Sequence, residues 1–214
     1  MSPKAIAASY AFISIAYIAL FHPNPSFMSA HLKMLPILLL AIATVLLAAP
    51  GWRWPVTTAL LFSALGDLLL ALDDLKGGLF IAGLGSFLMA QALYAWVFWR
   101  HRSPDAGRRW LALGYIPVGL LLAWLVLPAA DALALPVAVY LVGISLMVTG
   151  AAMTDRPLLV FAGALCFAAS DTLIAVNKFL VAVPAAGTLI MASYYLAQGL
   201  ICAGVLRRTG TVTS

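Results

Sequence analysis

The sequence has very few charged residues. Of its 214 residues, 12 are Lys or Arg and 7 are Asp, and there is no Glu, so that only 9% are charged. A soluble domain carries about 25%. Apolar residues make up 64%, more than a globule of this size can hide from water. This composition excludes a water-soluble enzyme and a disordered chain, and it predicts a protein whose solvent is the lipid bilayer.

Cysteine and histidine are also scarce. Cys166 and Cys202 both fall inside long apolar runs, where they are expected to be small core residues rather than a disulfide. All three histidines are expected in loops: His22, His31 and His101. A buried zinc hydrolase with histidine ligands is therefore disfavoured.

Long apolar segments separated by Pro, Gly and charged residues fill the chain. A membrane helix needs roughly 20 mostly apolar residues, and eight segments qualify: 5–21, 32–49, 54–72, 78–99, 110–127, 135–153, 157–176 and 184–206. We treat the first as a retained helix, because it is long for a signal peptide. The sequence predicts an all-α polytopic membrane protein whose residues 1–214 form a single transmembrane domain.

The distribution of Lys and Arg predicts the orientation. With the N-terminus inside, the inner segments hold Lys4, Arg53, Arg100, Arg102, Arg108, Arg109, Arg156, Arg207 and Arg208, and the outer ones only Lys33, Lys76 and Lys178. Both termini are then cytoplasmic, in the inner or plasma membrane if the source is bacterial. The net charge of +5 reflects these clusters and does not indicate nucleic-acid binding. Trp52, Trp54, Trp96, Trp99 and Trp110 are expected to form an aromatic belt at the inner boundary.

A weak internal repeat relates the two halves of the chain. Residues 64–71 align with 168–175 at an offset of 104, with four identical positions, and each copy leads into a polar corner: Asp73–Asp74 in one and Asn177–Lys178 in the other. Four helices per half would form a 4+4 parallel repeat about an axis along the membrane normal.

Two aspartates lie inside the predicted helices. An Asp at the centre of a membrane helix costs about 2.5–3.5 kcal/mol, which suggests that Asp67 and Asp171 have a function. Both helices run outward and place the carboxyls at the same depth, so we expect them to face each other across one cavity. Two nearby carboxyls in a poorly solvated site do not both ionise easily, which would leave one proton donor and one carboxylate for acid–base catalysis. The alternative is a packing role in which each carboxyl is bonded to a neighbouring helix.

Several other polar residues are candidates for substrate binding: Lys33, Ser63, Gln91, Tyr94, Asn177, Lys178, Tyr194 and Gln198. Gln91 and Tyr94 share one helix face, as do Tyr194 and Gln198; hydrogen bonding between helices is the alternative role. Lys33 and Lys178 are candidate phosphate anchors, although Lys33 is also placed as an interfacial lysine would be. Lys178 follows Asp171 by seven residues and is expected on the same face, where it could pair with that carboxyl.

These motifs resemble the YhhN family of membrane proteins. The stretches 63–70 and 83–94 are similar to the family's third and fourth spans, and residues 170–179 and 194–198 are similar to its seventh and eighth. Lys33-Met-Leu-Pro36 resembles the basic start of its second span. The length and the eight-span layout agree as well, so that the resemblance covers nearly the whole chain.

The resemblance implies lysoplasmalogenase activity, which is hydrolysis of the vinyl-ether bond of a 1-alkenyl lysophospholipid to a fatty aldehyde and a glycerophospho-alcohol. Asp67 and Asp171 would then supply the acid, the base and the stabilising anion, much as in glycosidases. No metal or organic cofactor is required. The partners would be the lysophospholipid substrate and the bilayer, with no nucleic acid. Many relatives have His where this chain has Gln91, and glutamine cannot transfer a proton at neutral pH.

Two other classes of function are open from the residues alone. A lipid or small-solute transporter could use the two aspartates as a proton or ligand site. A membrane scaffold would leave the two aspartates unexplained. Headgroup preference, chain length and oligomeric state do not follow from the sequence.

Overall fold

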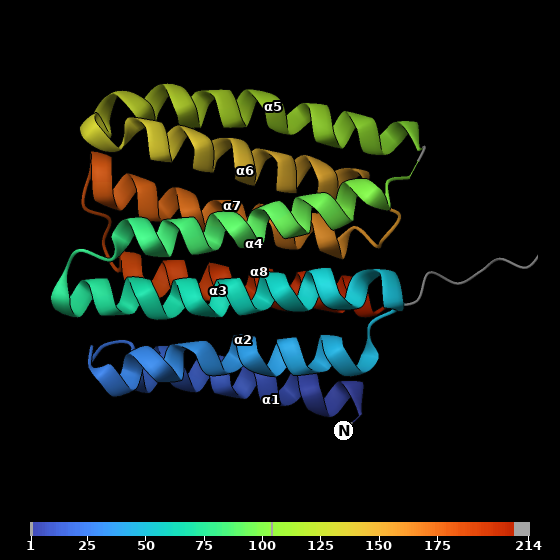
Figure 1. The fold of residues 1–214 in the computed structure, drawn as a ribbon, viewed down its shortest axis with the longest axis horizontal. Coiled ribbons are helices and arrows are strands. Elements are labelled where there is room, and N and C mark those ends of the chain that lie inside the picture. The colour runs from blue at the N-terminus through green and yellow to red at the C-terminus, as the bar shows by residue number, and fades with distance from the viewer. Residues whose placement is uncertain (1, 104, 208–214) are drawn as a thin grey trace, which may run out of the picture.

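The chain folds into a bundle of long helices that run between the same two ends (Figure 1). The structure, a computed structural model, describes residues 2–103 and 105–207. Its α-helices are α1 (Pro3–Ala16), α2 (Phe27–Leu47), α3 (Pro50–Lys76), α4 (Phe80–Arg100), α5 (Ala106–Val126), α6 (Ala134–Met153), α7 (Leu159–Ala175) and α8 (Ala186–Leu206). Two π-helical turns, η1 (Tyr17–Phe21) and η4 (Val176–Leu180), extend α1 and α7, and two 3-10 turns, η2 (Leu127–Ala129) and η3 (Asp131–Leu133), join α5 to α6.

The prediction of eight membrane-spanning helices is confirmed. Within the described residues, eight helical stretches of 19 to 27 residues are long and apolar enough to cross a bilayer. Local signals set their limits. Ser26 forms a capping box that starts α2 five residues before the predicted span, Pro50 opens α3, and Gly77 ends α3 with a φ of 72°, a conformation that glycine adopts without steric cost.

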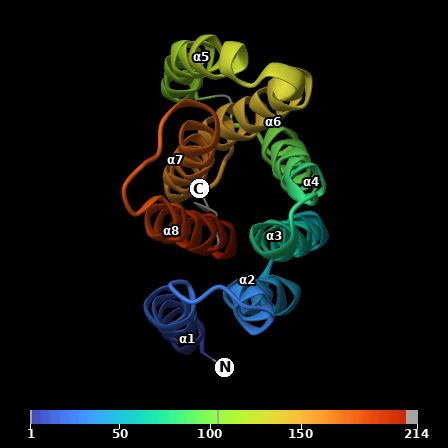
Figure 2. The same cartoon turned by 90° about the vertical axis from the view of Figure 1, so that its left-hand side faces the viewer.

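Six of the helices form a closed ring, and α1 and α5 lie outside it. Seen from one end, α2, α3, α4, α6, α7 and α8 follow one another around the core (Figure 2), and each packs on the next, including α8 on α2. The core of this ring consists of fully buried side chains such as Leu60, Phe98, Phe167 and Ile201. The polar residues of helices that are far apart in sequence therefore meet inside the ring.

Glycine allows α7 and α8 to approach closely. A Cβ atom on Gly163 would lie 2.8 Å from the carbonyl oxygen of Ala197 and from the backbone nitrogen of Ile201. Small residues at such contacts let helices pack backbone to backbone, which is a main source of helix association where the surrounding lipid is as apolar as the side chains. The α7–α8 contact holds the half of the ring that carries Asp171.

The two polar corners, which the predicted repeat relates, each contain a hydrogen bond of the same kind. Asp73 Oδ1 accepts a bond from the backbone N–H of Leu79 at 2.7 Å, and Asn177 Oδ1 accepts one from the N–H of Val183 at 3.0 Å. Each bond closes a loop six residues long, and the two acceptors are 104 positions apart. This match favours the 4+4 repeat, which stays a prediction.

The tryptophan belt is only partly as expected. Trp54, Trp96 and Trp110 are exposed on the bundle surface, whereas Trp52 is 2% exposed and stacks on His101 with ring centroids 4.5 Å apart. The expectation for Trp52 is therefore wrong, because its indole packs into the core. The start of α1 and the end of α8 lie at the same end of the bundle (Figure 1), but their cytoplasmic placement stays a prediction. Pro104 and Arg208 lie outside the described residues.

The close approach of α7 and α8 gives a stability prediction. Gly163→Ala should lower the thermal stability of the detergent-solubilised protein, because the added methyl group forces two backbones apart at a cost of roughly 1–3 kcal/mol. Gly114→Ala on α5 is the matched control, since nothing lies within 4 Å of a Cβ there. The measurement is the unfolding midpoint of both variants, and equal midpoints would contradict the packing described.

Candidate active site

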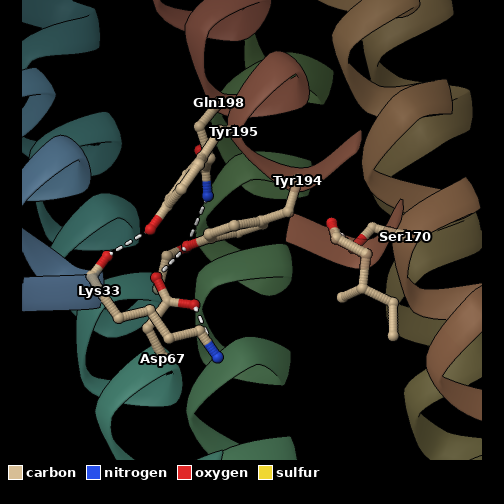
Figure 3. Close-up of polar contacts among 8 residues, drawn as sticks. Lys33, Asp67, Ser170, Tyr194, Tyr195 and Gln198 are labelled. Carbon is tan, nitrogen blue, oxygen red and sulfur yellow. Dashed lines mark hydrogen bonds and ion pairs between the residues drawn. The ribbon is translucent and has the colours of Figure 1, made fainter. Parts of the chain in front are cut away.

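A buried ion pair joins α2 to α3 inside the ring. Lys33 Nζ lies 3.9 Å from Asp67 Oδ1, with the lysine side chain 12% exposed and the carboxyl 3%. Tyr194 of α8 donates a hydrogen bond to Asp67 Oδ2 at 2.8 Å. Figure 3 shows these side chains converging from three helices, with Ser170 of α7 lying apart from them. The contacts hold the Asp67 carboxylate next to a cation and a hydroxyl.

A second set of hydrogen bonds lies about one helical turn from this cluster along α3 and α8. Tyr94 donates to Gln198 Oε1 at 2.8 Å, and Gln198 Nε2 donates to Ser63 Oγ at 3.0 Å. The hydroxyl of Tyr195 donates to the backbone carbonyl of Lys33 at 2.8 Å. Ser63, Tyr94 and Gln198 are 0% exposed, so they connect helices and do not face a pocket.

A second carboxyl cluster lies around Asp171. Its Oδ2 accepts two hydrogen bonds, from Gln91 Nε2 of α4 at 3.0 Å and from the Tyr140 hydroxyl of α6 at 2.8 Å. Its other oxygen, Oδ1, accepts none from the described residues and is not enclosed. Asp171 is only partly buried and lines an apolar pocket. The free oxygen is therefore the one available to a ligand.

The two carboxyls form separate clusters. Asp67 is bonded from α2 and α8, and Asp171 from α4 and α6, with no partner in common. Asp171 lines the apolar pocket, and Asp67 does not. The expectation that the two carboxyls face each other and divide one proton is wrong, because each is bonded from a different pair of helices and only Asp171 lines the apolar pocket.

A polar pocket lies at the predicted outer end of the bundle. Its volume is about 280 Å³, and it is lined by charged and polar side chains from four parts of the chain together with apolar ones: His22, Lys33, Leu70, Asp73, Asp74, Phe80, Ile174, Asn177, Lys178, Gly187, Ile190 and Met191. Burial, reinforced by the Lys33 ammonium, lowers the pKa of the His22 imidazole. The other ionisable side chains of the pocket are two lysines and two aspartates.

A narrow apolar pocket adjoins the polar one. Its volume is about 50 Å³, and its walls come from α3, α4, α5, α6, α7 and η4: Leu70, Phe80, Leu84, Phe87, Tyr115, Leu122, Val126, Val137, Tyr140, Leu141, Ile144, Ala168, Asp171, Thr172, Ile174, Ala175 and Phe179. Leu70, Phe80 and Ile174 line both pockets, and we refer to these three residues as the shared wall. The lysines and the Asp171 carboxyl lie on opposite sides of it.

The structure separates the predicted candidates into several roles. Lys33 and Lys178 line the polar pocket, and Gln91 bonds to Asp171. Of the two partners considered for Lys178, Asp171 is not the one it contacts: the Lys178 ammonium lies 4.0 Å from the centre of the Phe80 ring. The π-helical turn η4, which contains Lys178, changes the helical register after Asp171. Asn177 also lines the polar pocket, but its side-chain oxygen closes the loop before α8.

Sequence reasoning missed two tyrosines of the apolar pocket. Tyr140 donates to Asp171, and Tyr115 of α5 is buried with a hydroxyl that has no partner among the described residues. Each is an isolated polar residue in an apolar span, with no second polar group at helical spacing to mark a face. A mid-span tyrosine was the only signal, and tyrosine is also common in ordinary membrane cores.

Comparisons with known proteins agree over most of the chain. The model of the YhhN family matches residues 28–205. A lysoplasmalogenase from Mycobacterium tuberculosis is 35% identical over 205 residues, which cover 90% of this chain and 78% of the relative. Lysoplasmalogenase TMEM86A from Homo sapiens is 34% identical over 201 residues, covering 86% and 82%, and lysoplasmalogenase TMEM86B from Rattus norvegicus is 30% identical over 210 residues, covering 92% and 82%.

No solved structure matches the chain significantly. The family model covers most of the chain, and the described residues contain eight helices long and apolar enough to cross a membrane. The chain is a multi-pass integral membrane protein that belongs to the YhhN family.

Proposed function

We propose that this protein hydrolyses the vinyl-ether bond of lysoplasmalogens, releasing a fatty aldehyde and a glycerophospho-alcohol. The relatives with which it shares 30–35% identity are named lysoplasmalogenase. The observation that carries the proposal is the position of Asp171: a carboxyl with one free oxygen on the wall of an apolar pocket, next to a polar pocket that holds two lysines. The apolar pocket would match a hydrocarbon chain, Asp171 an acid-labile bond, and the two lysines a phosphate.

The first step is proton transfer to carbon. Both hydrogen bonds to Asp171 end on Oδ2, so that a neutral Asp171 carries its proton on Oδ1. This oxygen donates the proton to the alkene carbon farther from the ether oxygen, and the electron pair of the double bond forms the new C–H bond. An oxocarbenium ion results, and the Asp171 carboxylate beside it stabilises its positive charge.

The second step adds water, and the same carboxyl recovers its proton. Water attacks the carbon next to the ether oxygen while Asp171 accepts a proton from it, which gives a hemiacetal. The hemiacetal collapses when its hydroxyl loses a proton and the ether oxygen gains one, so that the C–O bond breaks. One water is consumed, and Asp171 ends protonated as it began. Every proton moves between substrate, water and this carboxyl, and the reaction requires no metal or cofactor.

Asp67 has a different role in this proposal. It does not line the apolar pocket, but it pairs with Lys33, which lines the polar one. A lysine ammonium on a flexible stem needs an anion to hold it inside a poorly solvated site. We assign Asp67 as a positioning residue that, with Tyr194, fixes the cation facing the phosphate. Gln91 and Tyr140 likewise position Asp171.

The role of Asp171 is tested by replacing it. Purified Asp171→Asn in detergent should release aldehyde from a 1-alkenyl lysophospholipid at least about 100-fold more slowly than wild type, the lower end for the loss of one acid–base group. Asp131→Asn is the matched control, because Asp131 is exposed in the η3 turn with a φ of 44°, which Asn also tolerates. It should retain wild-type activity.

Two results would contradict the assignment. Near-normal hydrolysis by Asp171→Asn would remove this carboxyl from the mechanism. A wild-type protein that moves the lipid across proteoliposome membranes without releasing aldehyde would instead favour transport.

The polar pocket gives a second prediction. Lys178→Gln should raise KM for the lysophospholipid by roughly 10-fold, since a hydrogen bond to a charged group is worth about 1.5–3 kcal/mol, and should leave kcat within about twofold. Lys76→Gln removes a lysine of the same end that does not line the pocket and should change neither constant. Steady-state kinetics of the three proteins provide the measurement. A fall in kcat at unchanged KM would be the opposite pattern and would exclude a binding role for Lys178.

A further inference from the structure

The apolar pocket runs along the bundle from its predicted outer end to its middle. Val137 and Ile144 both line it and are two turns apart on α6, so it is about 10 Å long at 1.5 Å per residue. Val126 and Phe179 lie at its outer end, and Tyr115 lies in the middle of α5 at its deep end. The pocket therefore leads inward from the depth of the headgroups, as a lipid chain does.

We propose that this pocket binds the single hydrocarbon chain of the substrate while the headgroup occupies the polar pocket, and that Ile144 at the deep end limits chain length. This inference rests on the proposed function and assigns the two ends of its substrate. The headgroup then lies on one side of the shared wall and the chain on the other. The bond that joins them lies near Asp171. The carbon that accepts the proton belongs to the chain, on the same side of the wall as Asp171.

The contrast between the two pockets supports this orientation. The polar pocket is lined by charged side chains, whereas the lining of the apolar one is mostly aliphatic and aromatic, so the charged end of the lipid matches only the former. Lys33 and Lys178 suit a phosphate, and Asp73 and Asp74 of the same pocket suit an ammonium group. Charges of both signs in one pocket complement a zwitterionic headgroup, such as phosphoethanolamine or phosphocholine.

The walls of the apolar pocket also suit an alkyl chain. Aromatic and branched side chains from several elements surround it, among them Phe80, Phe87 and Phe179. The Phe80 and Phe179 rings contact each other edge to face, with centroids 6.4 Å apart. Such walls offer an alkyl chain dispersion contacts along the length of the pocket.

The test is the dependence of activity on chain length. Ile144→Phe fills the deep end of the pocket, and it should lower kcat/KM for a long-chain 1-alkenyl lysophospholipid at least about 10-fold relative to a short-chain homologue, because a steric change in an apolar pocket is worth 10–200-fold. Val142→Phe makes a similar enlargement on the same helix, but this side chain is 59% exposed on the bundle surface. Val142→Phe should leave the ratio of kcat/KM for the long-chain and the short-chain substrate unchanged.

A second measurement keeps the inference testable if Ile144→Phe does not fold. Wild-type protein is given a saturated-ether lysophospholipid, which cannot be hydrolysed, with a photoreactive diazirine at the end of its chain. Crosslinks should fall on peptides of α5 and α6. Crosslinks confined to α1 or α2, or an Ile144→Phe protein with an unchanged chain-length ratio, would overturn the pocket assignment. An inactive wild-type protein that still crosslinks on α5 and α6 would refute the proposed hydrolysis but not the chain site.

Discussion

The structure depends on how one carboxyl group is held inside the bilayer. An unpaired polar group buried in hydrocarbon is costly, and a charge is more so. Gln91 and Tyr140 reduce this cost for Asp171 by donating two hydrogen bonds to the same oxygen. Gln91 comes from α4 and Tyr140 from α6, the helix that packs on both α4 and α7. The same two hydrogen bonds therefore join the helices and leave Oδ1 of Asp171 free.

The aspartates of the two halves of the chain are bonded from corresponding helices, but by different kinds of residue. Asp67 on α3 is bonded from α2 and α8, and Asp171 on α7 is bonded from α6 and α4. These pairs of helices correspond under the predicted 4+4 repeat. In the first half the partner is a lysine, which fixes an ion pair beside the polar pocket. In the second half both partners are neutral, which leaves a carboxyl free to hold and release a proton.

Hydropathy and cost arguments could predict much of this from the sequence. The eight spans follow from apolar length, and Asp67, Asp171 and Lys33 stand out because charged residues are rare in membrane helices. What could not be predicted is which helices face one another. Two carboxyls at equal depth can point at each other or at different neighbours, and only the order of helices around the ring decides. The same order brings Tyr140 to Asp171, and the η4 turn, which no sequence signal marked, directs Lys178 away from it.

The central claim is that a single carboxyl, fixed on the wall of a narrow pocket, delivers a proton to carbon from one side. The most direct test is hydrolysis in D₂O with the aldehyde reduced to the alcohol as it forms, followed by analysis of the carbon next to the former carbonyl. A fixed acid predicts one deuterium at this carbon, in a single configuration. A product without deuterium there, or with both configurations in equal amounts, would contradict protonation by a fixed Asp171.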